Sequence, residues 1–132
     1  MASGTFATAI SCMDGRTIIP VTEWMKKQFK VDYVDMITEA GPDKTLSQGT
    51  AEQIAAIRQK VAISINKHNS RVMAIVGHHD CAANPVDKET HFQQIKDCCA
   101  IIKIWELMIR TLGVWLNEKW DAEVIDDTAD QP

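Results

Sequence analysis

The chain has 132 residues, a length that predicts one compact domain spanning residues 1–132. Its 45% hydrophobic and 24% charged residues are typical of a soluble globular protein, and a net charge of -4 without a basic cluster argues against a nucleic-acid partner. No apolar run approaches the roughly 20 residues that span a bilayer, and the amino terminus lacks a secretion signal. We therefore expect a cytoplasmic protein with no membrane partner, in which the four cysteines stay reduced.

The first half of the chain predicts two strands and two helices. Residues 5–11 predict a strand because they are short, partly β-branched and followed by a turn-like CMDGR. Pro20 suits the first turn of a helix over residues 21–29. Residues 31–38 predict a second strand, closed by an AGPDK turn, and apolar residues at helical spacing predict a helix over residues 47–68.

The second half continues this alternation. The apolar run at residues 71–77 predicts a strand in the middle of a parallel sheet, and residues 88–112 predict a helix. Residues 113–125 predict a last strand, or two short strands that turn near Glu118, and we expect residues 126–132 to form a disordered acidic tail. Alternating strands and helices favour an α/β fold, with a mainly parallel β-sheet flanked by helices.

Two polar stretches follow predicted strands. SCMDGR places Cys12 after the first strand, and GHHDCA places His78 and Cys81 after the strand at 71–77. Ligands gather beyond the carboxyl ends of parallel strands, so these side chains could meet at one edge. Two thiolates and one imidazole form a good zinc ligand set that leaves a fourth position open. From the residues alone, a metal site and simple burial of small thiols are equally good interpretations.

Asp14 and Arg16 lie beside Cys12 and are separated by one residue. Alternate residues at a strand end can point to the same side, and a guanidinium can hold a carboxylate through two hydrogen bonds. An Asp14 carboxylate fixed in this way could face a metal. A surface ion pair of little energetic value is the alternative.

Both stretches resemble the β-class carbonic anhydrases. SCMDGR matches their Cys-x-Asp-x-Arg motif, VGHHDCA matches their His-x-x-Cys motif, and the order of helices and strands between them is similar. The resemblance covers nearly the whole chain and implies Zn²⁺ bound by Cys12, His78 and Cys81. It further implies that Asp14 hydrogen-bonds the zinc-bound water or hydroxide, and that Arg16 orients Asp14.

The resemblance also implies an activity and an assembly. Zinc lowers the pKa of its bound water from about 15.7 toward about 7. The implied enzyme is therefore a zinc-dependent lyase in which zinc hydroxide attacks carbon dioxide to give bicarbonate. Members of the family typically build the site at a dimer interface, which implies a homodimer or higher homo-oligomer.

Two departures from the family pattern leave other functions open. The turn from Thr38 to Asp43 reads TEAGPD where the family usually has Arg-Asn-Ala-Gly-Asn, and Ala82 replaces a common glycine. Small changes in a pocket can reorder close substrate analogues, so one alternative is a hydrolase of carbonyl sulfide or carbon disulfide at the same site. Another is a non-catalytic zinc-binding module stabilised by its metal.

Several further polar residues have no role in the predicted site. His68 and His91 lie at predicted helix ends, where we expect solvated surface positions. We expect Asp80 to cap the turn that follows it or to face water. Cys98 and Cys99 lie within the predicted late helix, and we expect at least one of them to be buried.

Overall fold

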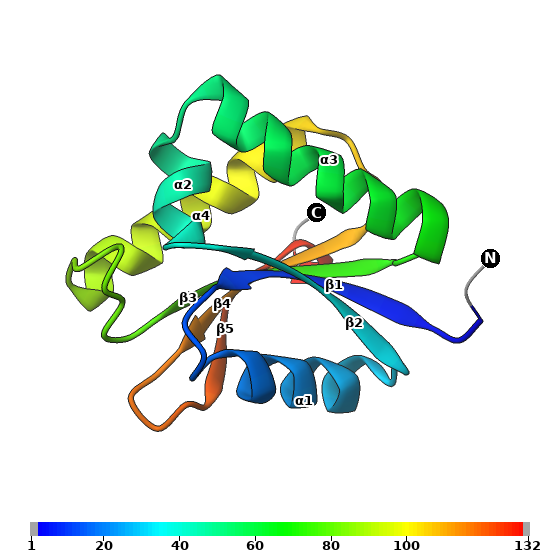
Figure 1. Cartoon of the computed structure of the whole chain (residues 1–132), viewed down its shortest axis with the longest axis horizontal. Helices are drawn as coiled ribbons and strands as arrows, with labels where there is room; N and C mark the ends of the chain where they lie inside the picture. Colours follow the sequence, from blue (N-terminus) through cyan, green and yellow to red (C-terminus); the bar gives the residue numbers. More distant parts are fainter. Residues whose placement is uncertain (1–2, 131–132) are drawn as a thin grey trace.

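The computed structural model describes residues 3–130 and consists of one five-stranded sheet with helices on both faces (Figure 1). The strands are β1 (Phe6–Cys12), β2 (Tyr33–Glu39), β3 (Val72–His78), β4 (Arg110–Leu116) and β5 (Ala122–Asp127). The helices are α1 (Ile18–Phe29), α2 (Pro42–Gln48), α3 (Ala51–His68) and α4 (Lys88–Ile104), followed by a short 3-10 helix, η1 (Thr128–Asp130). The predicted α/β class is confirmed. None of the helices in residues 3–130 is both long enough and apolar enough to cross a membrane.

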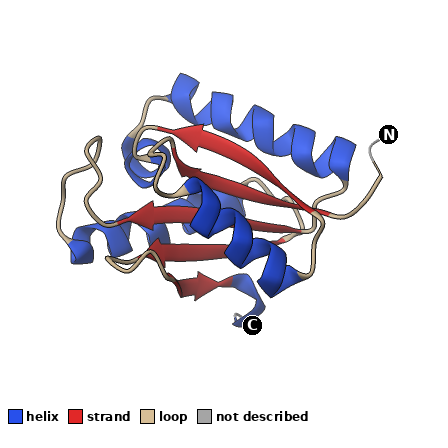
Figure 2. Ribbon diagram, turned by 60° about the horizontal axis from the view of Figure 1, so that its bottom comes forward, coloured by secondary structure: helices blue, strands red, loops and turns tan. Residues whose placement is uncertain are grey.

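The strand order is β2-β1-β3-β4-β5, and only β5 runs antiparallel to its neighbour (Figure 2). From β1 the chain first passes to β2 on one side and then returns to β3 on the other side. The winding direction therefore changes between β1 and β3. Ligand sites of open α/β sheets form beyond the carboxyl ends of the strands at such a point. Ile10 lies opposite Ile75 in the register, so Cys12 and His78 end neighbouring strands.

The sheet is buried on both faces, as the apolar strands predicted. Helix α1 covers one face, and α2, α3 and α4 cover the other (Figure 1). Val21 and Met25 of α1 pack on small strand residues such as Ala7 and Ala9. Every residue of β3 is buried, which explains its nearly continuous apolar sequence. The opposite face has its own apolar cluster, to which the three other helices contribute Leu46, Ile57, Val61, Ile95, Cys98, Cys99 and Ile102.

The predicted helix over residues 88–112 is too long at its carboxyl end. Helix α4 ends at Ile104, and β4 already begins at Arg110. Glu106 and Met108 in the connection have positive φ angles of 54° and 58°. A left-handed backbone ends the helix here without the glycine or proline that usually marks such a point.

The AGPDK segment is not only a turn, because Pro42 begins the helix α2. The predicted helix over residues 47–68 is consequently two elements, and α3 begins at Ala51. Thr50 caps α3, since its side chain accepts a hydrogen bond from the Gln53 N–H group while the Gln53 side chain accepts one from the Thr50 N–H group. This reciprocal pair separates α2 from α3.

The predicted two short strands at the end of the chain are confirmed, and the disordered tail does not begin at residue 126. β5 continues through Asp127, and η1 occupies the next three residues. The Arg110 guanidinium donates two hydrogen bonds to the Asp127 carboxylate, at 3.1 and 2.7 Å. This pairing fixes the strand end. The expectation for residues 131–132 falls outside the described residues.

Candidate metal centre

Three side chains predicted at the strand ends lie together in the structure. Cys12 ends β1, His78 ends β3, and Cys81 lies in the loop just beyond β3. Their ligand atoms all lie within 4.8 Å of one another, and no residue of the three is more than 4% exposed. Within residues 3–130, no other His, Cys, Asp or Glu side chains form such a group of three.

The donor set fits a tetrahedral zinc ion. The Cys12 and Cys81 Sγ atoms are 4.0 Å apart, and two sulfurs bound to tetrahedral zinc at about 2.3 Å would lie about 3.8 Å apart. His78 Nδ1 donates to the His79 carbonyl oxygen at 2.7 Å, which leaves Nε2 as the nitrogen with the lone pair. That Nε2 atom is buried and has no hydrogen-bond partner among the described residues. An unpaired buried nitrogen beside two thiols is the arrangement that a soft divalent cation would satisfy.

The pKa values of the two thiols are shifted in opposite directions. The hydrogen bond from the Cys81 thiol is the main cause that lowers the pKa of Cys12 far below its ordinary value, and the His78 ring lowers it further. The hydrogen bond to Cys12 raises the pKa of Cys81, and burial adds to this rise. The pair therefore favours one thiolate and one thiol, and a bound cation would replace the remaining proton.

Main-chain N–H groups also surround the sulfurs. Those of Gly41 and Asp14 lower the pKa of Cys12, and those of Asn84 and Ala83 act in the same direction on the pKa of Cys81. These donors come from the loop after β1, from the start of α2 and from the loop after β3. They partly neutralise negative charge on the thiolates without requiring a charged side chain.

The predicted contact between Asp14 and Arg16 is present. Arg16 Nε donates to Asp14 Oδ1 at 3.0 Å and Nη2 donates to Oδ2 at 2.7 Å, while the Arg16 main-chain N–H donates to Oδ1 at 2.9 Å. These bonds hold the pKa of the Asp14 carboxyl well below its usual range. Asp14 lies outside the group formed by the two thiols and the imidazole. The catalytic roles of both residues stay predictions.

Arg16 also joins the loops that follow β1 and β3. Its Nη1 atom donates to the Asp80 carboxylate and its Nη2 atom to the Asp80 carbonyl oxygen, both at 3.1 Å. The guanidinium carbon lies 4.9 Å from the centre of the Trp120 ring. Asp80 is largely exposed, as expected, but it pairs with Arg16 in addition to facing water.

The expected surface position of His91 is wrong. His91 is 2% exposed, and its Nδ1 atom lies 2.6 Å from Oδ2 of Asp43, which is itself 1% exposed. The cause is α2, which packs on the start of α4 and covers this side chain. No sequence pattern indicated the pair, because it joins residues far apart through a helix that the sequence did not predict. His68 is half-buried and pairs with Asp35 through its Nδ1 atom at 2.7 Å.

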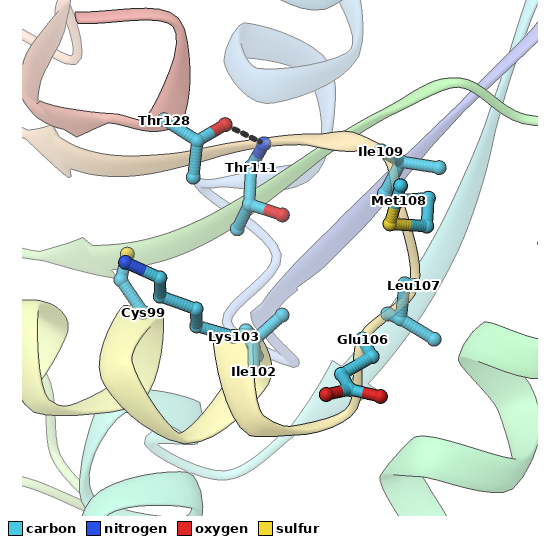
Figure 3. Close-up of a pocket in the computed structure, with 9 residues that line it drawn as sticks. All are labelled: Cys99, Ile102, Lys103, Glu106, Leu107, Met108, Ile109, Thr111 and Thr128. Carbon is cyan, nitrogen blue, oxygen red and sulfur yellow. Dashed lines mark hydrogen bonds between the residues drawn. The ribbon is translucent and has the colours of Figure 1, made fainter. Parts of the chain in front are cut away.

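A cavity of about 640 Å³ lies between the end of α4 and the start of β4, at the opposite end of the sheet from the thiols (Figure 3). The Thr111 N–H group donates to Thr128 Oγ1 at 3.0 Å beside it. Cys99 lines the cavity, and Cys98 is buried as well, so the expected burial of at least one of these cysteines is confirmed. Burial raises the pKa of Cys99 to about 12, which keeps its thiol neutral. Among residues 3–130, no group of three metal-ligating side chains lines this cavity.

A three-layer α/β fold with two thiols, one imidazole and an Asp-Arg pair at its switch point defines a class of candidate zinc proteins. The chain belongs to the putative carbonic anhydrase family, whose model matches residues 2–126. The resemblance to the β-class carbonic anhydrases is thereby confirmed at the level of the family. A comparison with curated proteins finds no match.

Several solved structures have a similar fold. A carbonic anhydrase from Glaciozyma antarctica is 19% identical, with 90% of this chain and 81% of that chain covered and a TM-score of 0.58. A β-carbonic anhydrase isoform from Trichomonas vaginalis is 16% identical, with 89% and 81% covered and a TM-score of 0.57. A tetrameric β-carbonic anhydrase from Sordaria macrospora is 10% identical, with 93% and 81% covered and a TM-score of 0.60. At these identities the likeness establishes the fold alone.

Proposed function

We propose that the chain binds one Zn²⁺ through Cys12, His78 and Cys81 and converts carbon dioxide and water into bicarbonate and a proton. The buried group of three donors, with Asp14 outside it, is the observation that supports this proposal most. A zinc site with three protein ligands keeps its fourth position for water. Zinc bound there would supply hydroxide near neutral pH, because it acidifies a water molecule.

Asp14 and Arg16 have complementary roles in this proposal. Asp14 is kept ionised by Arg16, so its carboxylate can only accept hydrogen bonds, and it would orient the O–H group of a water beside the metal donors. Arg16 is itself fixed by Asp80 and by the Trp120 ring. A movement of Asp14 onto the metal would break its two-pronged pairing with Arg16. We infer that Asp14 stays a water-orienting group and does not become the fourth ligand.

The proposal includes a reducing compartment, one folded domain and self-association. All four cysteines are free, which fits a cytoplasmic location. Met13 and Ile19, which follow Cys12 closely in the chain, are 66% and 65% exposed, and a second copy of the chain would bury such apolar side chains. Light scattering at increasing concentration tests this. A monomer at every concentration would remove self-association from the proposal.

The test of function combines metal content with stopped-flow hydration of carbon dioxide. We expect about one zinc per chain in the wild type and in Asp14→Ala, with activity at least about 100-fold lower in the variant, since such positioned carboxylates contribute about 10² to 10⁴ in rate. Asp97→Ala is the matched control, because Asp97 is an exposed carboxylate on α4 that accepts a hydrogen bond from the Gln93 side chain. Full activity in Asp14→Ala would remove Asp14 from the mechanism.

Two other outcomes would redirect the proposal. Zinc-loaded wild type that does not hydrate carbon dioxide but releases sulfide from carbonyl sulfide or carbon disulfide would identify the sulfur hydrolase. Zinc binding with no turnover of any of these substrates would identify a non-catalytic module in which the metal supports folding. Wild type that binds no zinc would overturn all three functions.

A further inference from the structure

A cluster of four buried polar side chains joins α2 and α4 to the loop after β3 that carries Cys81. It consists of Asp43 from α2, Asn84 from the loop after β3, and His91 and Gln94 from α4, and we call it the Asp43 cluster. The Asp43 carboxylate accepts hydrogen bonds from His91 Nδ1 at 2.6 Å and from Asn84 Nδ2 at 3.0 Å. Asn84 Nδ2 also donates to Gln94 Oε1 at 2.7 Å. Three separate segments of the chain are thus joined away from water.

The Asp43 cluster is joined through the main chain to both thiols. Asp43 lies two residues after Gly41, whose N–H group lowers the pKa of Cys12, and four residues after Glu39, which lies opposite Cys12 in the register of β1 and β2. Asn84 acts at both ends, because its N–H group donates to the Cys81 carbonyl oxygen at 3.2 Å while its side chain holds Asp43. The segments that contain Gly41 and Asn84 are therefore fixed to each other through the side chains of Asp43 and Asn84.

The surrounding chain leaves room for this arrangement. A Cβ atom on Gly77, the residue before His78, would lie 2.7 Å from Asp43 Oδ2. A Cβ atom on Gly41 would lie 3.1 Å from Asn84 Cβ. Glycine thus occurs at the two positions where a side chain would displace the Asp43 cluster.

Stability alone is a weak reason for such a group. Burying a carboxylate and its partners has a desolvation cost, and well-packed apolar side chains of similar volume often give equal or greater stability. A buried polar network instead specifies one geometry, since its directional bonds are satisfied in only one arrangement. The geometry specified here is that of the two segments beside the thiols.

We propose that the Asp43 cluster positions Cys12 and Cys81 for the metal by holding the main chain at Gly41 and Asn84 beside these two residues. This inference rests on the proposed zinc site. The cluster residues are positioning residues and touch neither metal nor substrate. Groups that orient metal ligands typically change metal affinity about 10-fold to 100-fold when they are removed.

The first test compares Asn84→Ala with Ser64→Ala. Ser64 is also buried and belongs to a polar cluster near the amino ends of β1 and β3, where its Oγ atom bonds Asp35 at 2.6 Å and Thr8 at 2.7 Å. Zinc affinity is measured by competition with a chelator, and unfolding of the metal-free proteins by urea. We expect at least about 10-fold weaker zinc binding in Asn84→Ala and less than about 3-fold weakening in Ser64→Ala.

The second test uses conservative rescue at His91. His91→Asn keeps a donor where Nδ1 lies, whereas His91→Leu removes it. We expect zinc affinity near that of the wild type in His91→Asn and clearly weaker binding in His91→Leu. Cobalt-loaded protein gives a second readout, because its thiolate-to-metal absorption should shift only in the variant that lacks the donor. This readout also serves if Asn84→Ala does not fold.

The outcomes separate this inference from the proposed function. Unchanged zinc affinity and an unchanged cobalt spectrum in Asn84→Ala and His91→Leu would overturn the positioning role while the enzyme remained. Equal weakening in Ser64→Ala would also overturn it, because the effect would then follow stability alone. Zinc-loaded wild type without activity, together with weaker binding in Asn84→Ala, would support the inference and overturn the enzyme. Wild type without zinc would overturn both.

Discussion

Gly77→Ala tests how closely the core around the candidate site is packed. The added methyl group would lie 2.7 Å from Asp43 Oδ2 and 2.8 Å from Ile95 Cδ1, and real Cβ contacts essentially never come so close. Overpacking of a core costs about 1–3 kcal/mol. A carboxylate displaced from a buried partner adds about 1–3 kcal/mol. We therefore expect the free energy of unfolding to fall by about 2–6 kcal/mol, the sum of these two costs.

Urea unfolding of the metal-free protein measures this change, with Gly15→Ala as the control. A Cβ atom on Gly15 would meet nothing within 4 Å, so that variant should keep the wild-type midpoint or gain slightly from the reduced freedom of its unfolded chain. Adding Ile95→Val to Gly77→Ala removes one of the two clashes and should restore part of the loss. If Gly77→Ala stays within about 1 kcal/mol of the wild type, the packing argument built on overpacking costs is refuted.

Three further predictions concern other parts of the molecule. Arg110 lowers the pKa of Asp127, so their pairing stabilises the fold above the ordinary aspartate pKa of about 3.9, and this stabilisation is lost as the pH falls below it. Urea titrations should show that the free energy of unfolding of Asp127→Asn is about 1 kcal/mol below that of the wild type at pH 7, and that this difference shrinks in acid. Thr50→Ala should lower the free energy of unfolding by about 1 kcal/mol. The double variant with Gln53→Ala should lower it by less than the sum of the two single variants, because each of the two side chains bonds the main chain of the other residue. Zinc at 1,000 times its dissociation constant should stabilise the fold by about 4 kcal/mol, so thermal melts with and without chelator should differ clearly; identical melts would contradict a metal bound in the folded state.

The sequence predicts the elements whose signals are local. β3 is an uninterrupted apolar run, and α3 repeats apolar residues such as Ile57 and Val61 at helical spacing, so both are placed within a few residues of their structural bounds. The sequence also indicated that Cys12, His78 and Cys81 could lie close together. Parallel strands end at one edge, and each of these residues ends a strand or follows it closely.

The features that the sequence missed depend on tertiary structure. Helix α2 has only seven residues and starts at Gly41 and Pro42, which usually indicate a turn. The end of α4 is set by left-handed residues in an apolar segment that continues the helical pattern, so no residue type marked it. His91 was placed at the surface because it lies at the end of a predicted helix. Only the packing of α2 against α4 shows that it is buried.

The altered turn before α2 bears directly on whether the proposed centre can still work. Pro42 lacks an N–H group, but it stands at the first helical position, where that group would have no partner within the helix. Gly41 has a φ angle of 63° and its N–H group lowers the pKa of Cys12, and the Glu39 carbonyl oxygen accepts from the Met13 N–H group at 2.9 Å. The departures therefore change side chains near the site while its main-chain donors persist. On this argument a substitution of Thr38 or Glu39 should alter substrate preference or rate more than zinc affinity, which is the reverse of the pattern expected for Asn84→Ala.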